Sequence, residues 1–283
     1  MSEQLKLGYI GLGNMGAPMA MRLLEWPGEL TVFDVRAEAM TPLAEAGAKL
    51  AENVAEVATA DIISVAVLND EQVREVVDEI AANAKPGTVI AIHSTISPDT
   101  AVELAEQLAP QGIHIVDAPV SGGAAAAGKG ELAVMVGAHR EVYERVKPVF
   151  KHFASVVVHA GEPGAGTRMK LARNMLTFTS YAAAGEAMKL AAAAGLDLQA
   201  LGRVVRHTDA QSGGPGAVVV RDDTADLEPD NFLYGPLAHA RDLGEKDLSL
   251  ALSLGETVGV ELPMAELALK NLAAGLGVPR TKE

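Results

Sequence analysis

The chain has 283 residues, of which 37 are acidic and 23 are basic, so its formal net charge at pH 7 is −14. A surface this acidic repels phosphate backbones and anionic lipid headgroups, which excludes nucleic acid and membrane surfaces as expected partners. Cysteine is absent, which excludes disulfides, thiolate metal sites and a cysteine nucleophile. The seven histidines have no metal-ligand spacing, so no metal is expected.

The N-terminal residues lack a basic segment followed by a long apolar one, so no signal peptide is expected. No apolar run reaches the roughly 18 residues that a membrane-spanning helix needs. These features and the lack of cysteine predict a cytoplasmic protein. The length predicts about two domains.

Up to residue 164, short Val- and Ile-rich runs alternate with helical patterns. The predicted strands are Leu5–Ile10, Leu30–Phe33, Ile62–Val67, Thr88–His93, His114–Asp117, Leu132–Val136 and Val156–His159. The predicted helices are Met15–Glu25, Ala37–Ala46, Glu71–Ala82, Pro98–Leu108 and Arg140–Phe150. Continuous apolar runs are typical of strands buried on both faces, so the alternation predicts an α/β domain with a doubly wound parallel sheet.

Beyond residue 164 the pattern becomes helical, and we place a domain boundary there: residues 1–164 form one domain and residues 165–283 an all-helical second one. A long helix over Thr167–Ala194 joins them, and its alanines predict close packing against a dimer partner or the second domain. Further helices are expected at Leu198–His207, Leu237–Val258 and Met264–Ala274, and loops at Ala124–Gly130 and Gln211–Gly216.

The first predicted strand leads into Gly11-Leu12-Gly13-Asn14-Met15-Gly16, which a helix follows. In this context Gly11 permits the tight turn, Gly13 lets a pyrophosphate approach the backbone, and Gly16 lets the helix pack closely on the strand. Asp34 stands at the end of the second predicted strand, about 20 residues after Gly13. A carboxylate that binds the adenosine ribose is expected at this distance from the middle glycine. Asp34 favours NAD because it repels a 2′-phosphate, whereas Arg36 leaves NADP as the alternative.

Two further motifs carry polar groups. Ser121-Gly122-Gly123 follows a strand and offers a hydroxyl and unhindered amides, which suit a carboxylate. Lys170 and Asn174 share one face of the long helix, four residues apart. A buried lysine there would have a lowered pKa and could exchange protons near neutrality, but an ordinary solvated lysine is the better interpretation of this motif alone.

Taken together, these motifs resemble the β-hydroxyacid dehydrogenase family, which includes 3-hydroxyisobutyrate dehydrogenase. The matching segments occur in the family's order and extend over nearly the whole chain. They are GYIGLGNMGAPMA at 8–20, HSTISP at 93–98, DAPVSGG at 117–123, GAGTRMKLARN at 164–174 and EKDLSLAL at 245–252. The resemblance implies a Rossmann-type N-terminal domain and an all-helical C-terminal domain joined by a long helix. The alanines of that helix predict a homodimer or homotetramer.

The resemblance also implies residue roles. Lys170 would be the catalytic acid/base with Asn174 as its polar companion, and Ser121, Gly122 and Gly123 would hold the substrate carboxylate. The implied cofactor contacts are Gly11, Gly13, Asn14, Met15, Gly16, Asp34, Leu68, Thr95 and Lys246. Asn69, Ile92 and Arg173 depart from the family pattern, and these departures leave the identity of the hydroxy acid open.

The expected reaction is hydride transfer between a small 3-hydroxy acid and NAD, in a cleft at the carboxyl ends of the strands. An NADPH-linked reductase of small aldehydes, such as glyoxylate or succinic semialdehyde, is the alternative that Arg36 supports. Imine reductases share the glycine motif, but many lack a lysine at the Lys170 position. A non-catalytic dinucleotide-binding module would need Asp34 and the glycines but neither Lys170 nor Ser121.

Overall fold

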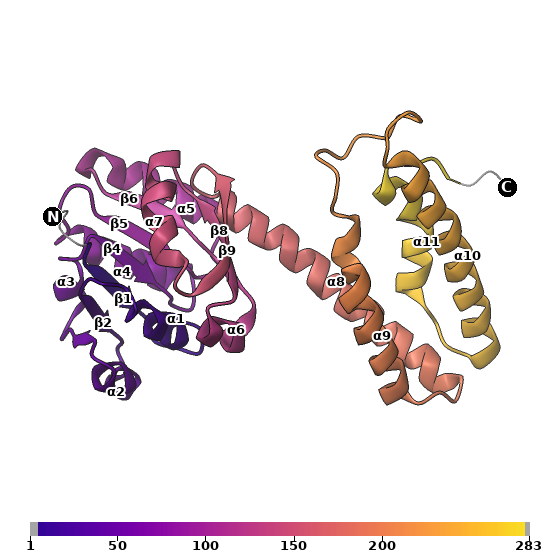
Figure 1. Ribbon diagram of the computed structural model, residues 1–283, viewed down its shortest axis with the longest axis horizontal. Coiled ribbons are helices and arrows are strands. Elements are labelled where there is room, and N and C mark those ends of the chain that lie inside the picture. Colours follow the sequence, from indigo (N-terminus) through magenta and orange to yellow (C-terminus); the bar gives the residue numbers. More distant parts are fainter. Residues whose placement is uncertain (1–4, 281–283) are drawn as a thin grey trace. The chain divides into compact units, whose positions relative to one another are not determined.

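The computed structural model describes residues 5–280, and the chain divides into two units between Arg173 and Asn174 (Figure 1). This division falls inside helix α8 (Ala165–Ala193), so one continuous helix supplies residues to both units. The boundary that the sequence places after residue 164 stays a prediction.

The first unit is built on one sheet, whose strand order is β3-β2-β1-β4-β5-β6-β8-β7 with β9 beside β8. The strands are β1 (Leu7–Ile10), β2 (Leu30–Phe33), β3 (Lys49–Leu50), β4 (Ile62–Val65), β5 (Val89–Ile92), β6 (His114–Asp117), β7 (Val120–Ser121), β8 (Leu132–Gly137) and β9 (Ala154–Gly161). Its first six positions follow the order of dinucleotide-binding folds, with β1 at the point where the chain reverses direction across the sheet.

Helices cover both faces of this sheet, which confirms the doubly wound architecture (Figure 1). One face carries α1 (Gly16–Leu23), α2 (Ala37–Glu45), α6 (Gly123–Lys129) and α7 (Arg140–Phe150). The other carries α3 (Val54–Val57), α4 (Asp70–Ala81) and α5 (Pro98–Leu108), and a 3-10 turn over Ala109–Gln111 follows α5. Alternate strand residues feed the two cores: Ile62 packs into the first, and Ile63 into the second.

Side-chain caps define where several helices begin. Asn69 accepts a hydrogen bond from the Gln72 amide at 2.9 Å, and Asn53 accepts one from the Glu56 amide at 3.1 Å. Ser97 caps α5 directly before Pro98, a residue favoured at the first position of a helix. These caps fix the helix starts beside the carboxyl ends of the strands, where the candidate site lies.

The structure differs from the sequence predictions at one edge of the sheet. The strand β8 runs antiparallel to β6 and β7, so the sheet is mixed rather than entirely parallel. Two short strands, β3 and β7, were not predicted. The predicted loop Ala124–Gly130 is wrong, because α6 occupies it; the run Ala124–Ala127 has the highest helix propensity, and Gly130 ends the helix with a φ of 73°.

The second unit comprises the rest of α8 together with α9 (Leu198–Ser212), α10 (Tyr234–Val258) and α11 (Pro263–Leu276). The predicted loop at Gln211–Gly216 is only partly correct, since α9 runs to Ser212 and a 3-10 turn covers Gly214–Val218. Glu186 of α8 accepts hydrogen bonds from the amides of Met264 and Ala265, which anchors the start of α11. Residues 5–280 contain no helix long and apolar enough to cross a bilayer.

Candidate active site

The glycine turn after β1 shows why each glycine stands where it does. Gly11 has a φ of 91°, and a Cβ there would lie 2.3 Å from the carbonyl oxygen of Ala66. A Cβ on Gly16 would lie 1.9 Å from the carbonyl oxygen of Gly11, so α1 can pack here only without a side chain. A Cβ on Gly13 would meet nothing within 4 Å. Gly11 and Gly16 therefore serve packing, whereas Gly13 leaves an open surface where a ligand can approach the backbone.

Asp34, directly after β2, points its carboxylate back to this turn. The side chain is 7% exposed and accepts hydrogen bonds from the amides of Leu12 at 2.7 Å and Arg36 at 2.9 Å. The Arg36 guanidinium adds an ion pair, with Nε 3.2 Å from Oδ1. Burial by itself raises the pKa of Asp34, but the two amides and Arg36 outweigh it, so the pKa lies below its ordinary value. Asp34 is thus an anion with remaining acceptor capacity.

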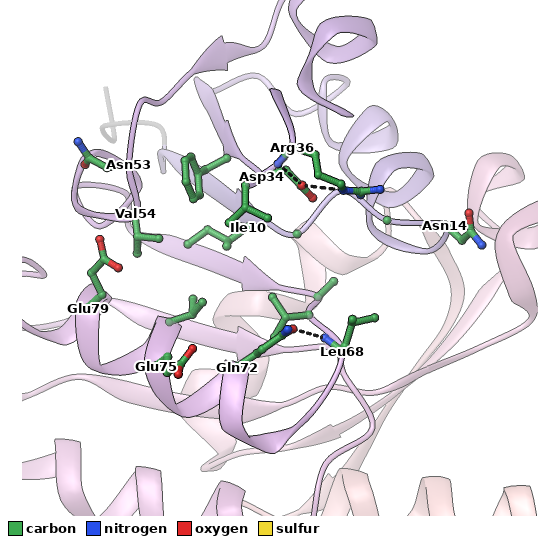
Figure 2. Close-up of a pocket in the computed structure, with 17 residues that line it drawn as sticks. Ile10, Asn14, Asp34, Arg36, Asn53, Val54, Leu68, Gln72, Glu75 and Glu79 are labelled. Carbon is green, nitrogen blue, oxygen red and sulfur yellow. Dashed lines mark hydrogen bonds and ion pairs between the residues drawn. The ribbon is translucent and has the colours of Figure 1, made fainter. Parts of the chain in front are cut away.

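The glycine turn and Asp34 form one side of a cavity of about 800 Å³ (Figure 2). Five of the predicted cofactor contacts line it: Gly11, Gly13, Asn14, Asp34 and Leu68. Three of the other four belong to the same unit but do not line the cavity, and Lys246 belongs to the second unit. Met15 packs against the core, Gly16 is buried under the turn, Thr95 is exposed in the loop between β5 and α5, and Lys246 is exposed on α10, paired with Asp247.

The cavity also contains residues that sequence reasoning missed. Asn53 caps α3, and Gln72, Glu75 and Glu79 project from α4 toward the cavity. The side-chain oxygen Oε1 of Gln72 accepts a hydrogen bond from the Leu68 amide at 3.0 Å. Polar residues spaced three and four apart on a helix usually form a face that is exposed to solvent. The local sequence therefore does not distinguish these cavity-lining side chains from ordinary surface residues. Only the sheet order brings α4 opposite Asp34.

The loop between β4 and α4 is held from the neighbouring strand. The Ser94 hydroxyl donates to the Val67 carbonyl at 2.7 Å and accepts from the Val67 amide at 3.0 Å. His93, directly after β5, is a core residue: its ring nitrogens form hydrogen bonds with the Ala118 carbonyl and the Ser64 hydroxyl. Burial lowers the pKa of His93 to about 4, so the ring is neutral.

Lys170, near the start of α8, is buried rather than solvated, being 8% exposed. Its Nζ donates a hydrogen bond to the Val120 carbonyl at 2.5 Å. Burial lowers the pKa of this lysine, and the positive charge of Arg173 lowers it further. The interpretation of this motif alone as a surface lysine is therefore wrong, because α8 turns the side chain onto the strand β7 and not into water.

The Val120 carbonyl directly precedes the Ser121-Gly122-Gly123 turn. Gly122 and Gly123 have φ values of 137° and 77°, which favour glycine. A Cβ on Gly122 would lie 2.9 Å from that of Ala126, but one on Gly123 would meet nothing within 4 Å. The structure thus brings Lys170 beside the predicted carboxylate-binding turn. Asn174 lies one helical turn after Lys170 in α8.

The arrangement fits a nicotinamide dinucleotide. The open backbone at Gly13 and the N-terminus of α1 suit a pyrophosphate, and Asp34 suits ribose hydroxyls. Within residues 5–280 there is no cluster of three or more His, Asp or Glu side chains that could hold a metal ion.

Comparison with known proteins identifies the family. The model for the NAD-binding domain of 6-phosphogluconate dehydrogenase matches residues 6–161, and that for the NAD-binding domain of NADP-dependent 3-hydroxyisobutyrate dehydrogenase matches residues 164–277. The chain belongs to the β-hydroxyacid dehydrogenase family. It is therefore an NAD(P)-dependent dehydrogenase of hydroxy acids, which confirms the resemblance drawn from its motifs.

Three relatives within this family illustrate the range of similarity. An uncharacterized oxidoreductase of Mycobacterium tuberculosis is 66% identical over 98% of this chain and 95% of its own. The 2-(hydroxymethyl)glutarate dehydrogenase of Eubacterium barkeri is 34% identical over 97% of this chain and 90% of its own. A crystal structure of an oxidoreductase from Mycobacterium avium 104 is 77% identical, with a TM-score of 0.96, and the match covers 98% of this chain and 100% of that one.

Proposed function

We propose that this dehydrogenase transfers hydride between NAD and a small 3-hydroxy acid resembling 3-hydroxyisobutyrate, with Lys170 as the general acid/base. The observation that carries the proposal is the buried amine of Lys170, held at the Val120 carbonyl directly before Ser121. Burying a lysine amine costs free energy of folding, so a buried lysine is a candidate functional residue. Here the amine lies beside the turn that would bind the substrate carboxylate.

In this proposal the Ser121 hydroxyl and the amides of Gly122 and Gly123 bind the substrate carboxylate. The two glycines carry no side chain, so the carboxylate can approach the backbone closely. The β-hydroxyl then lies beside Lys170 Nζ, and the hydrogen bond to Val120 keeps the amine turned toward the substrate. The nicotinamide, when bound, supplies the hydride acceptor.

The lowered pKa of Lys170 supports its role in both directions. Burial disfavours the ammonium form, and Arg173 adds electrostatic repulsion, so the amine can lose its proton closer to neutral pH. Neutral Lys170 takes the proton of the substrate hydroxyl during oxidation. Protonated Lys170 returns it to the carbonyl oxygen during reduction.

We further propose that NAD is preferred over NADP. Asp34 is anionic, and it already engages Arg36, the cation that would otherwise attract a 2′-phosphate. Initial rates with equal concentrations of NAD and NADP test this. Faster turnover with NADP would favour the alternative, an NADPH-linked reductase of small aldehydes.

The substrate class is tested by a panel with NAD, followed through nicotinamide absorbance: 3-hydroxyisobutyrate, 3-hydroxypropionate, glycerate, serine and 2-(hydroxymethyl)glutarate, the last because a relative is named for it. We expect turnover with at least one of these 3-hydroxy acids. NAD binding by calorimetry without turnover on any of them would instead support a non-catalytic dinucleotide-binding module.

The role of Lys170 is tested by Lys170→Ala, with the exposed Lys151→Ala as the matched control. We expect kcat to fall about 10²- to 10⁴-fold in the first variant and to stay unchanged in the second. The Kd for NAD should stay near the parent value in both. Turnover of Lys170→Ala within a factor of two of the parent enzyme would remove this lysine from the mechanism.

We also propose that the chain forms a homodimer or homotetramer. Met175, Phe178 and Tyr181 of α8 are 70%, 62% and 67% exposed, which is unusual for apolar side chains on one helix. Light scattering coupled to gel filtration measures the mass directly. A monomer at micromolar concentration would contradict this proposal.

A further inference from the structure

The start of α8 is held by a carboxylate from a distant strand. Asp117 is the last residue of β6 and is fully buried. Its Oδ1 accepts a hydrogen bond from the Gly164 amide at 2.7 Å, and its Oδ2 accepts one from the Thr167 amide at 2.7 Å. Amides at a helix start have no partner within the helix, and Gly164 has no side chain to cap them. Asp117 takes over that function from 47 residues away.

Two glycines, which have no side chain, allow this carboxylate and the helix to pack closely. A Cβ on Gly137 of β8 would lie 2.1 Å from Asp117 Oδ1, and one on Gly166 would lie 2.5 Å from the Asp117 carbonyl oxygen. Strands β6 and β8 and the first turn of α8 therefore meet at backbone distance. A helix packed this closely cannot slide or rotate without a collision.

A second hydrogen bond, made by Lys170, joins α8 to the segment that follows Asp117. Lys170 follows Thr167 by three residues and shares its helix face. Its Nζ reaches the carbonyl of Val120, three residues after Asp117. The segment from Asp117 to Val120 is thus fastened to α8 twice, once by the carboxylate and once by the lysine, and the Ser121-Gly122-Gly123 turn follows immediately.

We propose that Asp117 is a positioning residue, which sets the distance between the Lys170 amine and the Ser121-Gly122-Gly123 turn without touching the substrate. This inference rests on the proposed role of Lys170. A carboxylate suits the task better than an amide, because both of its oxygens accept. Asparagine would turn one N–H donor toward another, at Gly164 or Thr167.

Charged groups on or beside this part of α8 include Arg168 and Arg173, on the helix itself, and Asp117, from β6. The direction in which the pKa of Lys170 changes when Asp117 is replaced separates two explanations of how Asp117 acts. If Asp117 acts through position, its loss lets water reach Lys170, and the pKa of the amine rises toward its ordinary value. If Asp117 acts only as a nearby negative charge, its loss lowers the pKa of Lys170 instead.

The test is Asp117→Asn, with Asp61→Asn as the matched control. Asp61 also accepts a backbone amide, that of Lys6 at 2.8 Å, but it precedes β4 at the opposite end of the strands. The rate at which acetic anhydride labels Lys170, followed by mass spectrometry against pH, reports the pKa of the amine without using turnover.

We expect Asp117→Asn to shift the labelling profile of Lys170 upward by about one pH unit. We also expect kcat to fall about tenfold or more while the Kd for NAD is unchanged. In Asp61→Asn the labelling profile of Lys170 and kcat should match those of the parent protein. A downward shift, or a profile and kcat equal to those of the control, would overturn the inference.

Gly137→Ala keeps the charge of Asp117 and displaces its carboxylate by steric contact, so it serves if Asp117→Asn does not fold. We expect the same upward shift, of smaller size, and an unchanged profile would count against Asp117. The outcomes also separate this inference from the proposed function. An active Lys170→Ala enzyme would reject lysine catalysis, whereas an inactive one with an unmoved Asp117→Asn labelling profile would reject positioning alone.

Discussion

The glycine turn allows function to be separated from packing by two substitutions three residues apart. In Gly13→Ala the new methyl group meets nothing within 4 Å in the protein, and in Gly16→Ala it lies 1.9 Å from the Gly11 carbonyl oxygen. The two variants add the same group to the same turn. We expect the first to impair binding of the dinucleotide and the second to impair folding.

The magnitudes follow from these contacts. The φ of Gly13 lies outside the left-handed region, so alanine is compatible with its backbone and should leave stability unchanged or raise it by about 0.4–1 kcal/mol. The methyl group keeps a pyrophosphate from the backbone amides, and losing one or two charge-assisted hydrogen bonds at about 1.5–3 kcal/mol each weakens NAD binding by at least about tenfold. Gly16→Ala overpacks the turn and should cost about 1–3 kcal/mol or more.

Two assays measure these effects: thermal unfolding by circular dichroism and NAD binding by titration calorimetry. We expect Gly13→Ala to keep the parent Tm and lose affinity, and Gly16→Ala to lower Tm by about 5 °C or more. An unchanged Kd for NAD in Gly13→Ala would refute the assignment of the open surface to the pyrophosphate. A fall in the Tm of Gly13→Ala as large as the fall in Gly16→Ala would refute the steric argument.

Two further predictions concern titrating groups. Asp34→Asn should narrow the preference for NAD by raising the affinity for NADP, and calorimetry with both dinucleotides checks it; an unchanged ratio of the two Kd values would exclude Asp34 from selectivity. His93 is protonated in the unfolded chain below its usual pKa of 6.5 but stays neutral in the folded protein until about pH 4, so the folded state loses about 3 kcal/mol as pH falls through this window. Denaturant unfolding of the parent and of His93→Gln between pH 7 and 4 measures this, and equal slopes for the two proteins would contradict it.

Local patterns were sufficient for much of the fold. The runs Leu30–Phe33, His114–Asp117, Pro98–Leu108 and Arg140–Phe150 form elements with the predicted bounds. Their apolar spacing, and the Ser97-Pro98 start of α5, act within a few residues and can be read directly. The helix α6 also follows from a local signal, because alanine has the highest helix propensity and Gly130 ends the helix.

The sequence by itself determined the glycine turn, the carboxylate of Asp34 and the alternation that builds a doubly wound sheet. Only the tertiary structure decided that Lys170 is buried at the Val120 carbonyl, that α4 lines the cavity opposite Asp34, and that Asp117 caps a helix 47 residues later. The physical reason is range. Helix and strand signals depend on neighbours in the chain, whereas these contacts join segments that become neighbours only when the strands pair. The pairing of β1 with β2 and β4 brings α4 opposite Asp34, and the pairing of β6 and β7 with β8 brings Asp117 and Val120 to α8.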